Sequence, residues 1–251
     1  VVFVRGALPG EHVQATVVRR KPRFDVAETV SVDRPSISRV RPRCPHFGVC
    51  GGCATQHVEA GAQVAFKQRA LEETLWHLGR VRAALILPPI VGPAWGYRHR
   101  ARLTVRNVAK KGGVLVGFHE RGSSFVADMT ECHVLPPAVS ALLVPLRRLT
   151  ESLSIRDRMP QVEVAVGDRD DPPRQPIALV FRVLIPPSEE DLATLRDFAR
   201  RHRLDLWLQP KGPDSITLLI GAAGRAGSAD ATDRPPGGGA PPPPEASSLA
   251  Y

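Results

Sequence analysis

The sequence predicts a mixed α/β protein in which strands of a small barrel precede a larger α/β body and a disordered tail follows. Three observations carry this prediction. Short β-rich runs alternate with turns at the start, period-2 and period-3.6 segments alternate through the middle, and the last thirty residues are low in complexity. With 251 residues, 43% of them hydrophobic, the chain can form one large or two small cores.

The first domain is expected over residues 1–38. The runs Val1–Val4 and His12–Val18 are rich in β-forming residues, and the turn Leu8-Pro9-Gly10-Glu11 separates them. Residues 1–43 hold nine Lys and Arg against four Asp and Glu, so this short piece contributes more than half of the net charge of +9. The strands are therefore expected to form part of a basic barrel.

The second domain is expected over residues 39–217. Gly112-Gly113 reads as a hairpin turn and Ser188 as a helix N-cap. The expected elements, in order, are helix Ala60–Gly79, strands Arg100–Val105, Val114–Phe118 and Ser124–Asp128, helix Pro136–Arg148, strands Val162–Val166 and Ile177–Leu184, helix Ser188–Arg203 and strand Leu204–Leu208.

The tail, residues 218–251, is expected to be disordered, because Ala, Gly and Pro make up 20 of the 31 residues from Gly221 to Tyr251. Its onset interrupts an expected strand, Ser215–Ile220, which favours a frameshifted end over a natural linker. The run Gly221–Gly227 superficially resembles a cofactor-binding loop. The prolines that follow exclude the helix and strand such a loop requires, so we predict no cofactor site there.

Composition and charge argue against a membrane or secreted protein and favour one that binds a polyanion. No apolar run approaches the roughly 20 residues that span a bilayer, and no charged-then-apolar leader opens the sequence. We therefore expect a cytoplasmic, monomeric protein with no membrane partner. The basic surplus, with a pI near 10.1, favours a polyanionic partner, and nucleic acid is the first candidate.

Four cysteines carry the strongest chemical signal. Cys44, Cys50 and Cys53 form a C-x5-C-x2-C cluster, and Cys132 stands alone. A cytosolic chain of this size has little need of disulfides, so the cluster indicates a metal site. Three close cysteines and one distant cysteine favour a 4Fe-4S cluster over zinc. The C-x3-C-x2-C spacing of radical enzymes is absent, so we expect a structural or RNA-shaping cluster.

Zinc remains the alternative metal, because three histidines lie near the cysteines in sequence. His46, His57 and His133 could complete a mixed zinc site, although four thiolates already fill a tetrahedral one. The histidines are then ordinary solvated or packed imidazoles.

Basic residues at strand spacing are the candidate RNA contacts. Arg98, Arg100 and Arg102 would point to one face of a strand, beside Trp95 and Tyr97, which could stack on splayed bases. Arg19, Arg20 and Lys21 are expected at a hairpin tip and are weaker candidates. The alternative for both groups is an ordinary solvated surface.

Several motifs, taken together and in order, resemble the bacterial 23S rRNA uracil-5-methyltransferases that carry a TRAM domain and a 4Fe-4S cluster. The likeness covers about residues 1–216. The matching blocks are Gly6–Glu11 with Val13, the loop Cys44–Cys53 with Gln56, His57 and Lys67, the distant Cys132, and the segments Gly96–Leu103, Gly117–Ser123 and Gln209–Ser215.

The resemblance implies a partial TRAM domain, an OB-like β-barrel that holds RNA, then a central α/β domain whose four cysteines ligate the cluster. It also implies a C-terminal domain for S-adenosylmethionine, which this sequence lacks. The family's reaction needs a free cysteine that adds to C6 of the uracil. All four cysteines are assigned to the cluster, so we expect no catalytic or cofactor-binding residue here and no activity from this chain alone.

Two other functions stay open. The chain could be a stand-alone iron–sulfur or zinc RNA-binding module without catalysis. A ferredoxin-like electron carrier fits the cysteines but leaves the charge and the long α/β body unexplained.

Overall fold

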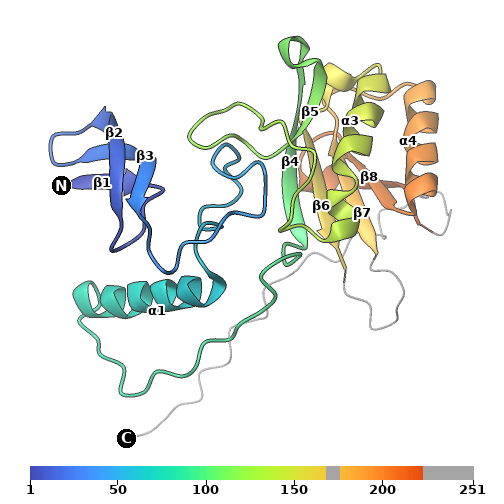
Figure 1. Ribbon diagram of the computed structural model, residues 1–251. Helices are drawn as coiled ribbons and strands as arrows, with labels where there is room; N and C mark the ends of the chain where they lie inside the picture. Colours follow the sequence, from blue (N-terminus) through green and yellow to red (C-terminus); the bar gives the residue numbers. More distant parts are fainter. Residues whose placement is uncertain (168–175, 223–251) are drawn as a thin grey trace, which may run out of the picture. The chain divides into compact units, whose positions relative to one another are not determined.

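The computed structural model describes residues 1–167 and 176–222 (Figure 1). These residues form two compact units. The first comprises residues 1–99 and 115–147, and the second combines residues 100–114 with the chain from Arg148 onward. The domain boundaries predicted at 38/39 and 217/218 stay predictions. Most of the tail, including Gly224 to Gly227, lies outside the described residues.

The chain begins with a three-stranded sheet. β1 (Val2–Arg5) runs parallel to β3 (Asp25–Arg34), and β2 (His12–Arg20) pairs with β3 antiparallel, which gives the order β1-β3-β2. The two predicted strands are confirmed, and β3 is an additional strand. Within the described residues the three strands do not close into a barrel.

One buried ion pair connects this sheet to the segment that leads to the cysteines. The Glu11 side chain is fully buried and accepts backbone N–H bonds from Leu8 at 2.8 Å and Ser36 at 3.0 Å. Arg39 donates to both carboxylate oxygens, through Nε at 2.5 Å and a terminal nitrogen at 2.6 Å. The Arg39 hydrogen bond is the main reason that the pKa of Glu11 falls from 4.5 to about 2.

The predicted helix after the cysteine loop is confirmed as α1 (Ala60–His77), shown in cyan in Figure 1. The Glu59 carboxylate caps it by accepting the N–H of Ala62 at 2.8 Å. No residue of α1 is buried, and Leu71 is 59% exposed. In the described part of the chain, α1 therefore adds no side chain to a core.

The middle of the chain differs from expectation at one strand. β4 (Arg100–Val108) and β5 (Gly113–Gly117) form as predicted, and Gly112 and Gly113 both take positive φ in the turn after the short helix η1 (Ala109–Lys111). The strand predicted over 124–128 is wrong. Among the described residues, only a single bridge, between His119 and Val126, forms there, after the turn over residues 121–125.

The single helix predicted over 136–148 is two helices, α2 (Pro137–Ser140) and α3 (Leu143–Ser152). Pro145 explains the break, because proline has no N–H for the carbonyl four residues earlier but is tolerated in the first turn of a new helix. α2 thereby ends close to the segment that carries Cys132.

The second sheet has the order β5-β4-β6-β7-β8-β9, and the boundary between the units passes through β5. The predicted strands and helix are confirmed with small shifts at their ends. Burial alternates along β6 and β7, as expected for strands with one covered face. The remaining elements are β6 (Gln161–Val166), β7 (Ile177–Arg182), α4 (Glu189–His202), β8 (Asp205–Gln209), β9 (Thr217–Ile220) and the short helices η2 (Arg156–Arg158) and η3 (Pro213–Ser215).

The start and end of α4 are determined by residues next to it in the sequence. Ser188 is the N-cap, as predicted, and forms a capping box with Asp191. The Asp191 carboxylate also accepts from the N–H and hydroxyl of Ser154, at 2.8 and 2.6 Å. Arg203 ends the helix in the left-handed conformation. None of the described helices is both long and apolar enough to cross a membrane.

Replacing Glu11 by Gln should lower the free energy of unfolding by about 2–4 kcal/mol at pH 7, because the Arg39 charge then loses its partner. In the wild type, the stabilisation from Glu11 should be complete above pH 4.5 and should be lost as the pH falls towards about 2. Denaturant unfolding of the full chain at several pH values measures both effects.

Glu28→Gln is the matched control, because Glu28 makes an exposed ion pair with Arg5 at 3.5 Å. That variant should change stability by less than about 1 kcal/mol. Equal stability losses in the two variants would contradict the role assigned to Glu11.

Candidate metal centre

The first three cysteines lie on one tight loop, Cys44–Cys53. The N–H of Phe47 donates to the Cys44 carbonyl at 3.1 Å, and the N–H of Cys50 donates to the His46 carbonyl at 2.9 Å. Gly48 has φ +95° in this turn, a conformation that side chains strongly disfavour. The loop therefore depends on glycine to return its second and third thiols towards its first.

A neighbouring hairpin anchors the far side of the loop. The N–H of Gly51 donates to the His119 carbonyl at 2.8 Å. At Gly52, an added Cβ would lie 2.9 Å from the Phe118 ring, too close for any side chain. The absence of a side chain thus lets the loop pack directly on the hairpin.

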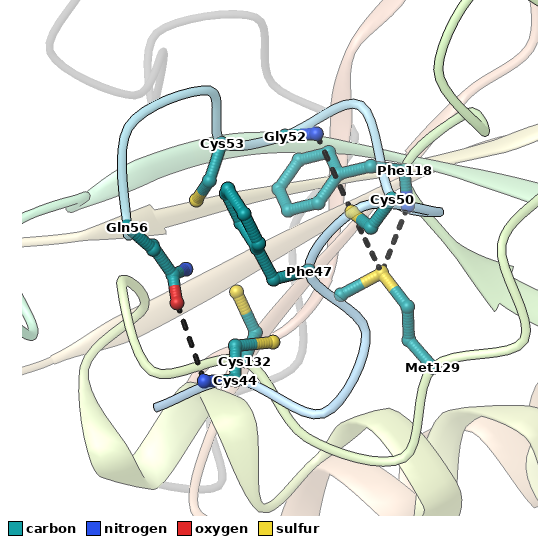
Figure 2. A pocket seen from close by; sticks show the side chains of 9 residues that line it. All are labelled: Cys44, Phe47, Cys50, Gly52, Cys53, Gln56, Phe118, Met129 and Cys132. Carbon is teal, nitrogen blue, oxygen red and sulfur yellow. Dashed lines mark hydrogen bonds between the residues drawn. The ribbon is translucent and has the colours of Figure 1, made fainter. Parts of the chain in front are cut away.

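The fourth cysteine reaches the same place from a distant part of the chain. The N–H of Cys132 donates to the Ser140 hydroxyl of α2 at 2.8 Å. Two residues earlier, the N–H of Thr130 donates to His46 Nε2 at 3.2 Å. All four cysteines line one cavity (Figure 2).

This cavity is small, about 10 Å³, close to the space one water molecule needs. The Phe47 ring projects into the space between the thiols (Figure 2). Among the described residues, no three His, Cys, Asp or Glu side chains are placed to hold a metal ion together. The structure thus brings the predicted ligands to one cavity, but their sulfurs as they stand do not form a coordination sphere.

The donor set itself suits a thiophilic metal. Burial raises the pKa of Cys44, Cys50 and Cys132, and the charge of Cys53 raises all three further. Backbone N–H groups oppose this shift, including that of Gly52, which lies 3.3 Å from Cys50 Sγ. Such thiols stay protonated at neutral pH unless a cation holds them as thiolates.

The three histidines proposed for a mixed zinc site do not line this cavity. His46 is engaged with Thr130, as described above. The buried His57 ring lies 5.4 Å from the Phe47 ring, and His133 packs edge-on against Trp95 at 6.0 Å. Their surroundings match the alternative interpretation of packed imidazoles.

Two arginines lie beside the cysteine loop, Arg121, which the sequence did not single out, and Arg98, which was predicted only as an RNA contact. The Arg121 guanidinium donates to the Cys53 carbonyl at 3.0 Å and lies 5.7 Å from the centre of the Phe47 ring. The Arg98 guanidinium lies 5.3 Å from the centre of the Phe118 ring, and its charge opposes slightly the rise that burial causes in the pKa of Cys50. No local pattern in the sequence signals either contact.

The prediction that Arg98 shares a strand face with Arg100 and Arg102 is wrong, because β4 begins at Arg100. Arg100 and Arg102 are both exposed, two residues apart on the strand. Arg102 pairs with Glu163 of β6 at 3.0 Å, so a carboxylate offsets part of the charge of this patch.

The other predicted RNA contacts are accessible. Tyr97 is 50% exposed, and Arg19, Arg20 and Lys21 are exposed where β2 turns towards β3. Exposure permits contact with a polyanion but does not distinguish it from a solvated surface.

Comparison with known proteins gives close relatives. No family model matches the sequence. The chain is 62% identical over 219 residues to the 23S rRNA (uracil(1939)-C(5))-methyltransferase RlmD of Bordetella pertussis, a match that covers 87% of this chain and 46% of that protein. The protein of the same name from Burkholderia ambifaria is 62% identical over 217 residues, with 86% and 45% covered. The chain thus spans about half the length of these relatives.

A solved structure shares the fold. The Pyrococcus abyssi tRNA (uracil-54, C5)-methyltransferase, in complex with S-adenosyl-L-homocysteine, has a TM-score of 0.56 and 19% sequence identity. The match covers 83% of this chain and 46% of that one.

In metal-free protein, iodoacetamide should modify Cys53 first, because Cys53 is partly exposed and the other three thiols are buried with raised pKa values. Mass spectrometry of peptides after short exposures gives the order of modification. Fully denatured protein is the control, in which the four rates should converge. Earlier modification of Cys44 or Cys132 would contradict the geometry of the loop.

Proposed function

We propose that this chain is the RNA-recognition and iron–sulfur portion of an S-adenosylmethionine-dependent 23S rRNA uracil-5-methyltransferase. The observation that carries the proposal is the 62% identity over 219 residues to the Bordetella pertussis enzyme of that activity. At this level of identity over most of the chain, the relatives' substrate class is the best guide to its own.

In this proposal Cys44, Cys50, Cys53 and Cys132 ligate a 4Fe-4S cluster. Support comes from the shared cavity and from the backbone N–H groups near the buried sulfurs, an arrangement that suits thiolate ligands of a cluster. When bound, the cluster would supply a cross-link between the 44–53 loop and the segment before α2. Arg98 and Arg121 would hold positive charge beside it.

The assignment of all four cysteines as cluster ligands also decides which steps of the reaction this chain can perform. The sequence has four cysteines, so with all four as ligands none is left to attack a uracil. Methyl transfer and S-adenosylmethionine binding are therefore assigned to the part of the enzyme that this chain does not match. The role of this chain is to hold the rRNA.

The RNA-contacting residues in this proposal are the exposed basic and aromatic groups of both units. Arg100 and Arg102 offer charge on β4, and Tyr97 offers a ring for stacking. Arg19, Arg20 and Lys21 offer a second basic group at the β2–β3 turn. Arg98 is assigned mainly to the cysteine loop because of its packing on Phe118.

Anaerobically purified protein should contain iron and sulfide in equal amounts and absorb broadly in the visible range. Cys132→Ser should lose most of the iron, because it removes the ligand that joins the two segments. Iron and sulfide assays with an absorption spectrum test this. Colourless protein with bound zinc would reassign the site and favour the stand-alone zinc module.

Met129→Leu is the matched control for the cysteine variant. Met129 lines the same cavity, 3.7 Å from Cys50 Sγ, but is not assigned as a ligand. A swap of similar volume should leave the iron content unchanged. Equal loss of iron in both variants would indicate that Cys132 acts only through packing.

Single-stranded RNA should bind with strong salt dependence. In the double variant Arg100→Ala/Arg102→Ala, the slope of log affinity against log salt should fall by about 1.4, the equivalent of two phosphate contacts. Fluorescence anisotropy titrations at several salt concentrations measure the slope.

The double variant Arg200→Ala/Arg201→Ala removes the same charge from the end of α4 and should leave the slope nearly unchanged. If both variants lower the slope of log affinity against log salt equally, RNA is attracted by the overall positive charge of the protein and not by the β4 face in particular. If neither does, this face makes no phosphate contact.

A further inference from the structure

A second and larger cleft lies within the first unit, next to the cysteine cavity. Its volume is about 330 Å³, within the range of small-molecule sites. Gly52, Cys53 and Gln56 contribute to both spaces, and Figure 2 shows these three from the side of the smaller one. The cysteine loop is therefore the wall between the two.

Aromatic side chains form one side of this cleft. Trp95 and Tyr97 both line it, and Gly96 between them has φ +68°. The N–H of Gly96 donates to the His133 carbonyl at 3.0 Å, and the N–H of Arg98 donates to the Val134 carbonyl at 2.8 Å. The backbone that carries the two rings is thus held in place, while Tyr97 itself remains half exposed.

The start of α1 also lines the cleft, and its polar groups are already engaged. The Glu59 carboxylate caps the helix. The Gln63 amide donates to the Val58 carbonyl at 2.9 Å and lies 3.0 Å from the Thr55 hydroxyl. These bonds make a preformed wall rather than a flexible one.

Positive charge borders the same space. Arg41 lines the cleft and is exposed, and among the described residues it has no carboxylate partner. The Arg43 guanidinium lies 5.5 Å from the centre of the Trp95 ring. A ligand of this cleft would therefore meet the half-exposed Tyr97 ring and the exposed Arg41 guanidinium together.

We propose that this cleft binds one unstacked base of single-stranded RNA, with the base against Tyr97 and an adjoining phosphate on Arg41. The inference rests on the proposed RNA-binding function and assigns it a specific site. The volume suits a single base and its sugar, and aromatic faces with a nearby arginine are the usual means of holding unstacked bases. A base seated there would also cover Cys53, the one cysteine that is partly exposed.

The test compares Tyr97→Ala, Tyr97→Phe and Arg41→Ala with the wild type on a single-stranded RNA oligonucleotide. Tyr97→Ala should weaken binding about 5- to 150-fold, the range expected for one lost base–aromatic stack, without changing the salt slope. Tyr97→Phe keeps the ring and should bind normally. Arg41→Ala should lower the slope by about 0.7, one phosphate contact.

Two controls separate stacking from misfolding. Phe125→Ala removes another exposed ring, 65% accessible and outside the cleft, and should bind normally. An oligonucleotide of the same length that lacks bases should bind the wild type and Tyr97→Ala equally, because it has nothing to stack.

The failures of the two proposals are distinguishable. Wild-type protein that binds no RNA would overturn the RNA function and this site together. Salt-dependent wild-type binding that Tyr97→Ala leaves intact would overturn the cleft alone. A loss in Tyr97→Ala that extends to the abasic oligonucleotide would also overturn it, because stacking would not be the cause.

Discussion

The first unit is organised around the burial of thiols in one cavity. Burial alone opposes their ionisation, and each buried thiol also feels the charge of Cys53. Neutral thiols are stable in such a cavity, whereas thiolates would need a compensating cation. The glycines of the loop, the Ser140 hydroxyl and the His46 ring all act to bring the two cysteine-bearing segments together.

The same constraint connects the cavity to its surroundings. The Glu11–Arg39 pair ties the first sheet to the segment before the loop. From there, the N–H of Val40 donates to the His57 carbonyl at 3.0 Å, so the chain is held on both sides of the cysteines. Because the loop also forms a wall of the larger cleft, any group that orders the thiols would order that wall as well.

Local features of the sequence predicted most elements. Alternation of apolar residues identified β6 and β7, and the Ser188 cap identified the start of α4, because both signals depend on neighbours within a few residues. Errors arose where a distant partner decides the outcome. The strand expected over residues 124–128 is reduced to one bridge with His119, and no residue of α1 is buried among the described residues.

By itself, the sequence predicted the tight turns of the loop that carries Cys44, Cys50 and Cys53, because the spacing and the glycines are local properties. It also determined that the chain is basic. Only the tertiary structure decided where the charges and rings act. It placed Arg98 over the Phe118 ring, paired Arg102 with Glu163, and brought Tyr97 and the start of α1 to one cleft. These outcomes depend on contacts between residues far apart in the chain, and no single-residue pattern encodes them.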